Sequence, residues 1–402
     1  MKTLNTKLTA LAACCALPMM FAAANANAFD FDVDGTKVSV GGYAKLMMNY
    51  DTDGVHRAPQ NGDLFGVYNI AVDGSPDAEA NDLDLTARES RLFVATAKET
   101  EYGTLTSKIE GDFFADIDAD GPTFSNSHGF RIRHAYVQLK NGNETILTGQ
   151  TWTTFMDFAS SMPTMDFAAD PGNPFARQAQ IRYQHDFRPG HNVSVSLENP
   201  TNGLCSAGPA IYLTNCGSTV AQDKVPDMVV KYFYANNTFT FSPRAVLRRF
   251  EIDGKSAFGY GLAAGASMKF GADHKVVMNA MYGDGIGRYA GLGYNAGAGL
   301  DATGEIDTVK YTSITGGLQL KATDKLLVTV GAGYAKQDKD QFESGLLGGA
   351  AIKHTLGVHS YVYYDLTKDL QYAFGITHGR LTNLLEQDGD MTRYQAYVKY
   401  AF

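Results

Sequence analysis

The chain ends in Tyr394-Gln-Ala-Tyr-Val-Lys-Tyr-Ala-Phe402, a stretch in which the character of the side chain changes at every position. Side chains of a β-strand point alternately to its two faces. One face of this stretch is therefore apolar with aromatic ends, and the opposite face is polar and cationic. Such a strand suits a wall with lipid on one side and water on the other. The lipid side would hold Tyr394, Ala396, Val398, Tyr400 and Phe402, and the water side Arg393, Gln395, Tyr397 and Lys399.

A final strand of this kind, with phenylalanine at its end, resembles the last strand of bacterial outer-membrane barrels. Residues 1–28 agree, because a short basic start, an apolar middle and a small-residue exit are the layout of a cleaved signal peptide. A retained membrane helix is disfavoured, since the apolar run is short and contains Pro18. A lipoprotein signal at residues 11–14 would leave too few apolar residues before its cleavage point. We predict a signal peptide over 1–28 and a single barrel domain over 29–402.

The composition favours a barrel over a soluble domain. The chain has 42 Gly, 22 Tyr and 23 Phe against one Trp, and only 19% of its residues are charged. No stretch after the signal peptide holds 18 consecutive apolar residues, so no transmembrane helix is expected. The formal net charge of −9 argues against nucleic acid as a partner. It does not decide the charge of a pore, which depends on local residues.

Alternating runs separated by turn residues predict an all-β fold, a transmembrane antiparallel β-barrel of about sixteen strands, the even number usual for such barrels. A soluble β-sandwich also alternates, but it would place Lys and Glu where these runs oppose an apolar face with Gly, Ser, Gln and Thr. The connections between hairpins, such as 51–82 and 283–303, are long and acidic. The strands are expected to begin near Val38, Leu85, Thr104, Phe130, Thr145, Ala176, His191, Val225, Thr238, Ser256, His274, Asp307, Lys325, Ala350, Leu370 and Met391.

One connection, at about residues 151–175, differs from the others because it is strongly apolar. It follows roughly the fifth strand, and its Phe and Met side chains would be poorly placed on an exposed loop. We therefore predict that it folds inward against the barrel wall as a constriction loop. Its expected site residues are Trp152, Asp157, Asp166 and Asp170, with the three aspartates presented to the channel, and Arg177, which follows the loop and would anchor it.

The cysteines predict one structural disulfide. Cys14 and Cys15 would leave with the signal peptide, so Cys205 and Cys216 remain, both in a polar segment at about 200–224. An even count in an exported chain is typical of a disulfide, here stapling an extracellular loop. A redox or metal pair is disfavoured, because no His or acid lies nearby at ligand spacing. We expect no metal site and no cofactor.

Three central motifs resemble the DcaP-like trimeric porins. They are Phe130-Arg-Ile-Arg-His-Ala-Tyr-Val-Gln-Leu139, Gly149-Gln-Thr-Trp-Thr-Thr-Phe-Met-Asp157 and Phe175-Ala-Arg-Gln-Ala-Gln-Ile-Arg-Tyr183. The resemblance implies a homotrimer of 16-stranded barrels in the outer membrane, surrounded by lipid and lipopolysaccharide. It also implies passage of small anionic solutes, with dicarboxylates as the expected class. The chain departs from the family pattern at residues 29–36, which are too short and acidic for a helical coiled-coil extension before the first strand.

The alternation of side chains along each predicted strand, here called strand parity, indicates which charged residues should face the pore. An arginine on the lipid face costs about 2–4 kcal/mol at mid-depth, so arginines that alternate with apolar residues should face the lumen. A ladder of inward arginines favours anions. Alternatively, each arginine pairs with a luminal acid and holds the loop. The candidates are Arg91, Arg131, Arg133, Arg182, Arg244 and Arg248, with Glu110 and Asp112 as inward acids and Arg249 facing outward.

Other functions fit the sequence less well. A barrel enzyme would need a nucleophile beside one of the histidines, and no such arrangement is recognisable around His134, His185, His354, His359 or His378. An energy-coupled transporter would need a folded plug before the first strand. A non-conducting structural or adhesive barrel remains an alternative. We expect an outer-membrane channel for small hydrophilic anions, and no enzymatic activity.

Overall fold

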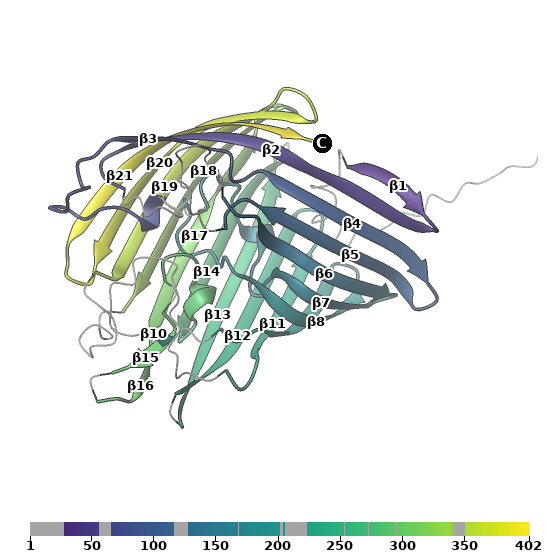
Figure 1. Ribbon diagram of the computed structural model, residues 1–402, viewed down its shortest axis with the longest axis horizontal. Helices are drawn as coiled ribbons and strands as arrows, with labels where there is room; N and C mark the ends of the chain where they lie inside the picture. Colours follow the sequence, from purple (N-terminus) through teal and green to yellow (C-terminus); the bar gives the residue numbers. More distant parts are fainter. Residues whose placement is uncertain are drawn as a thin grey trace, which may run out of the picture.

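The computed structural model describes residues 28–55, 66–115, 128–167, 169–201, 204–205, 223–252, 254–271, 273–294, 296–301, 303–338, 340 and 350–402. Long antiparallel strands dominate these residues and run obliquely around a common interior (Figure 1). The first half holds β1 (Phe29–Val33), β2 (Thr36–Thr52), η1 (Gly66–Tyr68), β3 (Asp82–Thr86), β4 (Arg91–Thr100), β5 (Gly103–Asp112), β6 (Arg131–Asn141), β7 (Glu144–Trp152), η3 (Phe158–Ser160), β8 (Arg177–Arg188), β9 (His191–Glu198) and β10 (Leu204–Cys205). The second half holds β11 (Asp227–Ala235), β12 (Phe239–Ile252), β13 (Lys255–Phe270), β14 (His274–Asp284), η4 (Gly287–Ala290), β15 (Ala298–Leu300), β16 (Ile306–Thr308), β17 (Lys310–Lys321), β18 (Leu326–Gln337), β19 (Ile352–Asp365), β20 (Leu370–Asn383) and β21 (Asp388–Ala401).

Sixteen strand positions close the barrel, as the sequence predicted. Each strand pairs antiparallel with the next, from β2 through β4–β9, β11–β14 and β17–β21. β21 then returns to β2, so the ring has no open edge. β3 and β4 together count as one strand of the ring, because both pair with β2 and only residues 87–90 separate them. All sixteen predicted strand starts fall at or within a few residues of one of these positions.

The alternation of the terminal strand follows its prediction. Tyr394 and Tyr400 of β21 are 40% and 53% exposed on the outer surface, whereas Arg393 and Gln395 are 1% and 0% exposed inside. At the end of the strand, the backbone groups of Phe402 and Gly42 exchange two hydrogen bonds, of 3.0 and 3.1 Å. The carboxyl end of the chain therefore completes the ring by bonding to β2.

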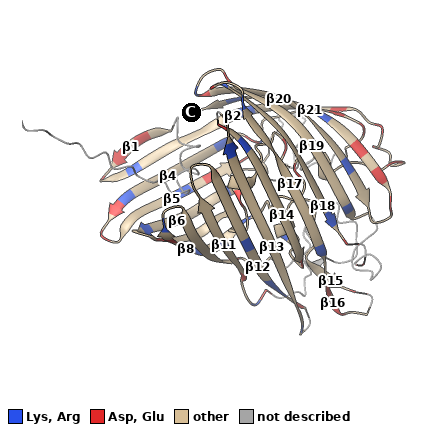
Figure 2. Ribbon diagram, turned by 180° about the vertical axis from the view of Figure 1, so that it is seen from behind, with Lys and Arg blue, Asp and Glu red and all other residues tan. Residues whose placement is uncertain are grey.

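Outward side chains of the other strands are mostly apolar, and long stretches of the strands carry no charged residue (Figure 2). The apolar band on the outside is the surface that lipid would cover. The described residues include no helix long and apolar enough to cross a membrane.

Some segments lie outside the ring or outside the described residues. β1 pairs with the start of β2, and β10, β15 and β16 form a separate small sheet. The predicted signal peptide falls almost wholly on residues that the structure does not describe, and so does Cys216. The signal peptide and the disulfide therefore stay predictions.

In the part of the chain that the structure describes, several connections fold into the barrel interior, where the sequence predicted one. The apolar connection after β7 is one of them. Segments 66–72 and 285–294, which belong to the two long connections described above as acidic, also fold inward. Their apolar side chains pack with each other and with the wall in a single cluster. Burial of apolar area drives this packing. Its fully buried members include Val67, Phe155, Ile286, Tyr289 and Met391.

Candidate functional site

The connection between β7 and β8, here called the inner loop (residues 153–176), leaves the wall and crosses the barrel interior. Its base is closed by a hydrogen bond from the Thr153 amide to the Ala176 carbonyl, 3.0 Å long. Phe155 is fully buried and Met165 is 1% exposed, as expected for anchors in a dry contact. The prediction of an inward, apolar loop after the fifth strand agrees with this placement.

Side chains of distant strands hold the inner loop by its backbone carbonyls. Lys231 of β11 donates to the Met156 carbonyl at 2.9 Å, and Lys275 of β14 donates to the Ala159 carbonyl at 2.8 Å. Farther round the ring, the Tyr363 hydroxyl of β19 donates to the Pro163 carbonyl at 3.1 Å. The loop therefore lies against the wall from β11 to β19, opposite the strands from which it starts.

The three aspartates of the inner loop do not face an open channel, contrary to the sequence expectation. Asp157 lies 3.3 Å from Lys231 and 3.6 Å from Arg244. Asp170 contacts His359 of β19 at 2.6 Å. A carboxylate in a dry contact is costly unless it is paired, and both are paired with the far wall.

Asp166 shares a buried arginine with a carboxylate of β2. Arg393 of β21 binds Asp51 through two nitrogens, at 2.6 and 2.8 Å, and its third nitrogen binds Asp166 at 2.7 Å. The Gly66 amide also donates to Asp166, at 3.3 Å. Arg393 therefore ties β2, the inner loop and the inward segment 66–72 together.

The strands on the other side of the ring carry a row of inward cations, here called the basic wall. Arg131 of β6 forms a bidentate pair with Asp112, with both bonds at 2.9 Å, and remains 33% exposed. Arg91 of β4 is 21% exposed and lies 3.9 Å from Glu110. Cations outnumber carboxylates among these described residues, so the wall presents positive charge. Its members are Lys45, Arg91, Lys108, Arg131, Arg133, Arg177, Arg182 and Lys399, with Glu89, Glu110 and Asp112 as the acids between them.

Within the wall, the arginines differ in their access to water. Arg133 is only 3% exposed, because it bonds to both Glu110 and Asp112, at 2.9 and 2.8 Å. Arg182 of β8 bonds to the Gln180 side chain and the Trp152 carbonyl. No carboxylate of the described residues lies within ion-pair distance of Arg182, whose charge is therefore not neutralised by direct contact.

Both ends of the inner loop meet the basic wall through aromatic rings. The Arg177 guanidinium lies over the Trp152 ring, 4.4 Å from its centroid, and Arg133 lies over the same ring at 6.0 Å. Phe158 and Phe175 contact the edges of this ring at 5.3 and 4.9 Å. Phe158 is 44% exposed, so an aromatic surface of the loop reaches water beside the cations.

Arg244 and Arg248 face inward as predicted, but they hold buried groups instead of lining an open space. Their side chains are 0% and 2% exposed. Arg244 bonds to Asn279 besides Asp157. Arg248 binds Asp227 at 3.0 Å and donates to the Ile286 carbonyl of an inward connection at 3.1 Å. Their expected pore-lining role is therefore replaced by one of anchoring the inward segments.

Sequence reasoning missed several residues of the site. Lys45, Lys108 and Lys399 belong to the basic wall, and Lys231 and Arg393 hold the inner loop. Strand parity was a sufficient signal for all five, since each alternates with outward apolar residues. The sequence placed Arg393 and Lys399 on the water side of the last strand without giving them a partner or a role, and Lys45, Lys108 and Lys231 were not among the candidates.

Comparisons with known proteins place this geometry among porins. A family model described as DcaP outer membrane protein matches residues 16–402. The outer membrane channel DcaP of Acinetobacter baumannii has a similar structure, with a TM-score of 0.75, 20% identity, and coverage of 92% of this chain and 99% of that chain. An anion-selective porin from Comamonas acidovorans matches with a TM-score of 0.59 and 13% identity, covering 91% of this chain and 100% of that chain. The trimer form of in-vitro folded OmpT of Vibrio cholerae matches with a TM-score of 0.56 and 11% identity, covering 92% and 100%. A search of the curated proteins finds no match.

Proposed function

The chain belongs to the DcaP outer membrane protein family and is an integral outer-membrane β-barrel of the porin type, and from this we propose that it is a diffusion channel that favours small hydrophilic anions. The basic wall is the observation that carries the proposal. A charge held in a water-filled space with low-dielectric walls raises the local concentration of counter-ions. Arg91, Arg131 and Arg182 are the wall residues proposed to meet the solute.

Dicarboxylates are the proposed solute class. Each carboxylate of a solute gains from a charge-assisted hydrogen bond to a guanidinium or ammonium group. Arg182 has no carboxylate of the described chain in direct contact, and Arg131 keeps a third of its surface exposed. Cations on several neighbouring strands would let a solute with two charges engage two of them at once. The description of the Comamonas acidovorans neighbour as anion-selective supports the sign of the preference.

The proposed assembly is a homotrimer. The Vibrio cholerae neighbour is described in a trimer form, and porin barrels share the outer apolar band through which copies would pack. Mass measurement of the purified protein in detergent tests this proposal. A mass of three chains is expected, and a monomer mass under conditions that preserve the fold would contradict it.

A bilayer reversal-potential measurement in a salt gradient tests the anion preference. We expect anion selectivity for the unchanged protein and a several-fold smaller anion-to-cation ratio for Arg91→Gln, Arg131→Gln and Arg182→Gln together. Lys368→Gln is the control for a positive charge lost outside the lumen, because Lys368 is 79% exposed in a short turn, and each single arginine variant is compared with it. Cation selectivity of the unchanged protein would contradict the proposal. Liposome swelling with a dicarboxylate and a neutral solute of equal size then tests the solute class.

A further inference from the structure

The inner loop presents aromatic rings instead of charges to the lumen. Its only charged residues are the three aspartates, and all three bind side chains of β11, β19 and β21. Phe158 is 44% exposed, and Phe167 and Phe175 are partly exposed. Because the basic wall lies across the lumen from the strands that hold the loop, apolar surface and cations border the same space.

Trp152, the last residue of β7, brings the exposed ring and two of these cations to one place. Phe158 contacts the edge of the Trp152 ring, with the ring centroids 5.3 Å apart. The Arg177 guanidinium lies over the face of the same ring, 4.4 Å from its centroid. Arg182 donates to the Trp152 backbone carbonyl. Phe158, Arg177 and Arg182 are therefore arranged around a single residue.

Both guanidinium groups keep capacity for an anion. Nη1 of Arg177 is buried without a hydrogen-bond partner. In the described ranges of the chain, no carboxylate lies within ion-pair distance of Arg177 or Arg182. An unsatisfied buried donor is costly, and a charge-assisted hydrogen bond to a carboxylate is strong. A carboxylate of a solute would supply the missing partner.

The Phe158 ring adds a second requirement for the solute. An inorganic or polyhydroxylated anion would bind the guanidinium groups and leave the ring in water. A carboxylate with a bare hydrocarbon segment would also cover the ring, and removal of apolar surface from water is favourable. The arrangement therefore fits an anion that is charged at one end and apolar beside it.

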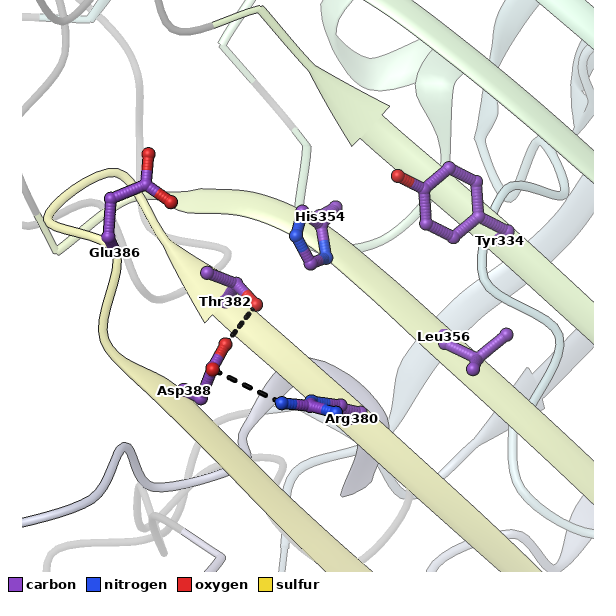
Figure 3. A pocket seen from close by; sticks show the side chains of 7 residues that line it. All are labelled: Tyr334, His354, Leu356, Arg380, Thr382, Glu386 and Asp388. Atoms are coloured by element: carbon purple, nitrogen blue, oxygen red, sulfur yellow. Dashed lines mark hydrogen bonds and ion pairs between the residues drawn. The ribbon is translucent and has the colours of Figure 1, made fainter.

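A pocket of about 390 Å³ on the outer surface, between β18, β19 and β20, shows a contrasting arrangement (Figure 3). Tyr334 supplies an aromatic ring there, and Glu386 and Asp388 supply two acids. Its single arginine, Arg380, already donates to Asp388 at 3.2 Å. An arginine near a ring does not make an anion site when a carboxylate of the chain occupies its donors. Arg380 is therefore a suitable control for Arg177.

We propose that the residues around Trp152 form a binding site in the lumen for carboxylates that carry a bare hydrocarbon segment. Arg177 and Arg182 hold the carboxylate, and the hydrocarbon segment lies against Phe158. The site rests on the proposed anion channel and adds a preference among anions. At equal charge and similar size, a solute with hydroxyl groups on its carbon atoms binds less well.

Blocking of the ion current through the full-length protein in a planar bilayer tests this preference with succinate and tartrate. Both are four-carbon dicarboxylates with two charges at neutral pH, but tartrate has a hydroxyl group on each inner carbon. We expect succinate to block at a concentration about threefold to tenfold lower, since that factor corresponds to about 30–50 Å² of apolar surface removed from water. Phe158→Ser should abolish the difference, and Phe158→Leu should retain most of it.

Two controls separate the site from general effects. Phe187→Ser is matched to Phe158→Ser, because Phe187 is 43% exposed but faces outward near the end of β8. Arg177→Gln should weaken the block by succinate and tartrate by the same factor, whereas Arg380→Gln should weaken neither. The reversal potential in a salt gradient should not change with either Phe158 variant, because no charge is altered. The heat-induced mobility shift of the barrel verifies that each variant is folded.

The outcomes distinguish a failure of the site from a failure of the channel proposal. Equal block by the two solutes, no block by either, or a preference that survives Phe158→Ser would overturn the site while anion selectivity persists. An unchanged block in Arg177→Gln would remove Arg177 from it. Cation selectivity of the unchanged protein would instead contradict the anion channel on which the site rests.

Discussion

At the scale of single residues, Arg393 is the most consequential ion-pairing group of the interior. Its side chain is 1% exposed and it satisfies Asp51 and Asp166 together. Arg393→Gln would remove the ion pairs that Arg393 makes with the buried carboxylates of Asp51 and Asp166, and removing one partner of a buried pair costs about 3–5 kcal/mol. We expect a lower thermal unfolding temperature in detergent and larger current fluctuations, because the inner loop loses its tie to β21. Lys368→Gln, which removes a cation that is 79% exposed, is the control and should leave both quantities unchanged.

The residue scale also shows where sequence reasoning stops. Parity predicted that Arg131, Arg182, Arg244 and Arg248 face inward, and all four do. Strand parity does not predict whether an inward guanidinium group is exposed to water or covered by a connection that folds into the lumen. Arg248 is buried because residues 285–290 happen to pack over it, and Asp166 finds a partner 227 residues later in the chain. Such contacts depend on how loops fill the lumen, which no local pattern encodes.

At the scale of elements, we expect that the ring of strands stays closed when the inner loop is replaced. Thr153 and Ala176 are already joined by a backbone hydrogen bond, and Trp152 opposes Arg177 in the ladder, so a short glycine-serine turn can replace residues 154–175. We expect single-channel conductance to rise several-fold. Anion preference should persist, because Arg91, Arg131 and Arg182 stand on strands. Replacing residues 301–305 between β15 and β16 by a similar turn is the control.

An unchanged conductance after this replacement would mean that another inward connection limits the flow. Segments 66–72 and 285–294 are the candidates, since both pack in the same cluster as Phe155.

The sequence contains a signal for the inward fold of segment 66–72, because Val67, Tyr68 and Ile70 form a short apolar stretch in an otherwise acidic connection. Strand patterning gives the ring and the number of strands because every strand repeats the same alternation. Connections lack such a repeat, so the inner loop was predicted to fold inward, whereas the described segments 66–72 and 285–294 were not.

At the scale of the whole molecule, anion preference would arise from the summed field of the basic wall, although the formal net charge of the chain is −9. A summed field is screened by salt, since the Debye length falls from about 10 Å at 0.1 M to about 3 Å at 1 M. We therefore expect the anion-to-cation ratio from reversal potentials to fall toward unity when both chambers are made tenfold more concentrated at a fixed gradient. A ratio that stays constant would locate selectivity in direct contact between the solute and a single desolvated cation. Arg182→Gln would then abolish the preference alone, whereas in the field mechanism it lowers the ratio only in part, because Arg91 and Arg131 remain.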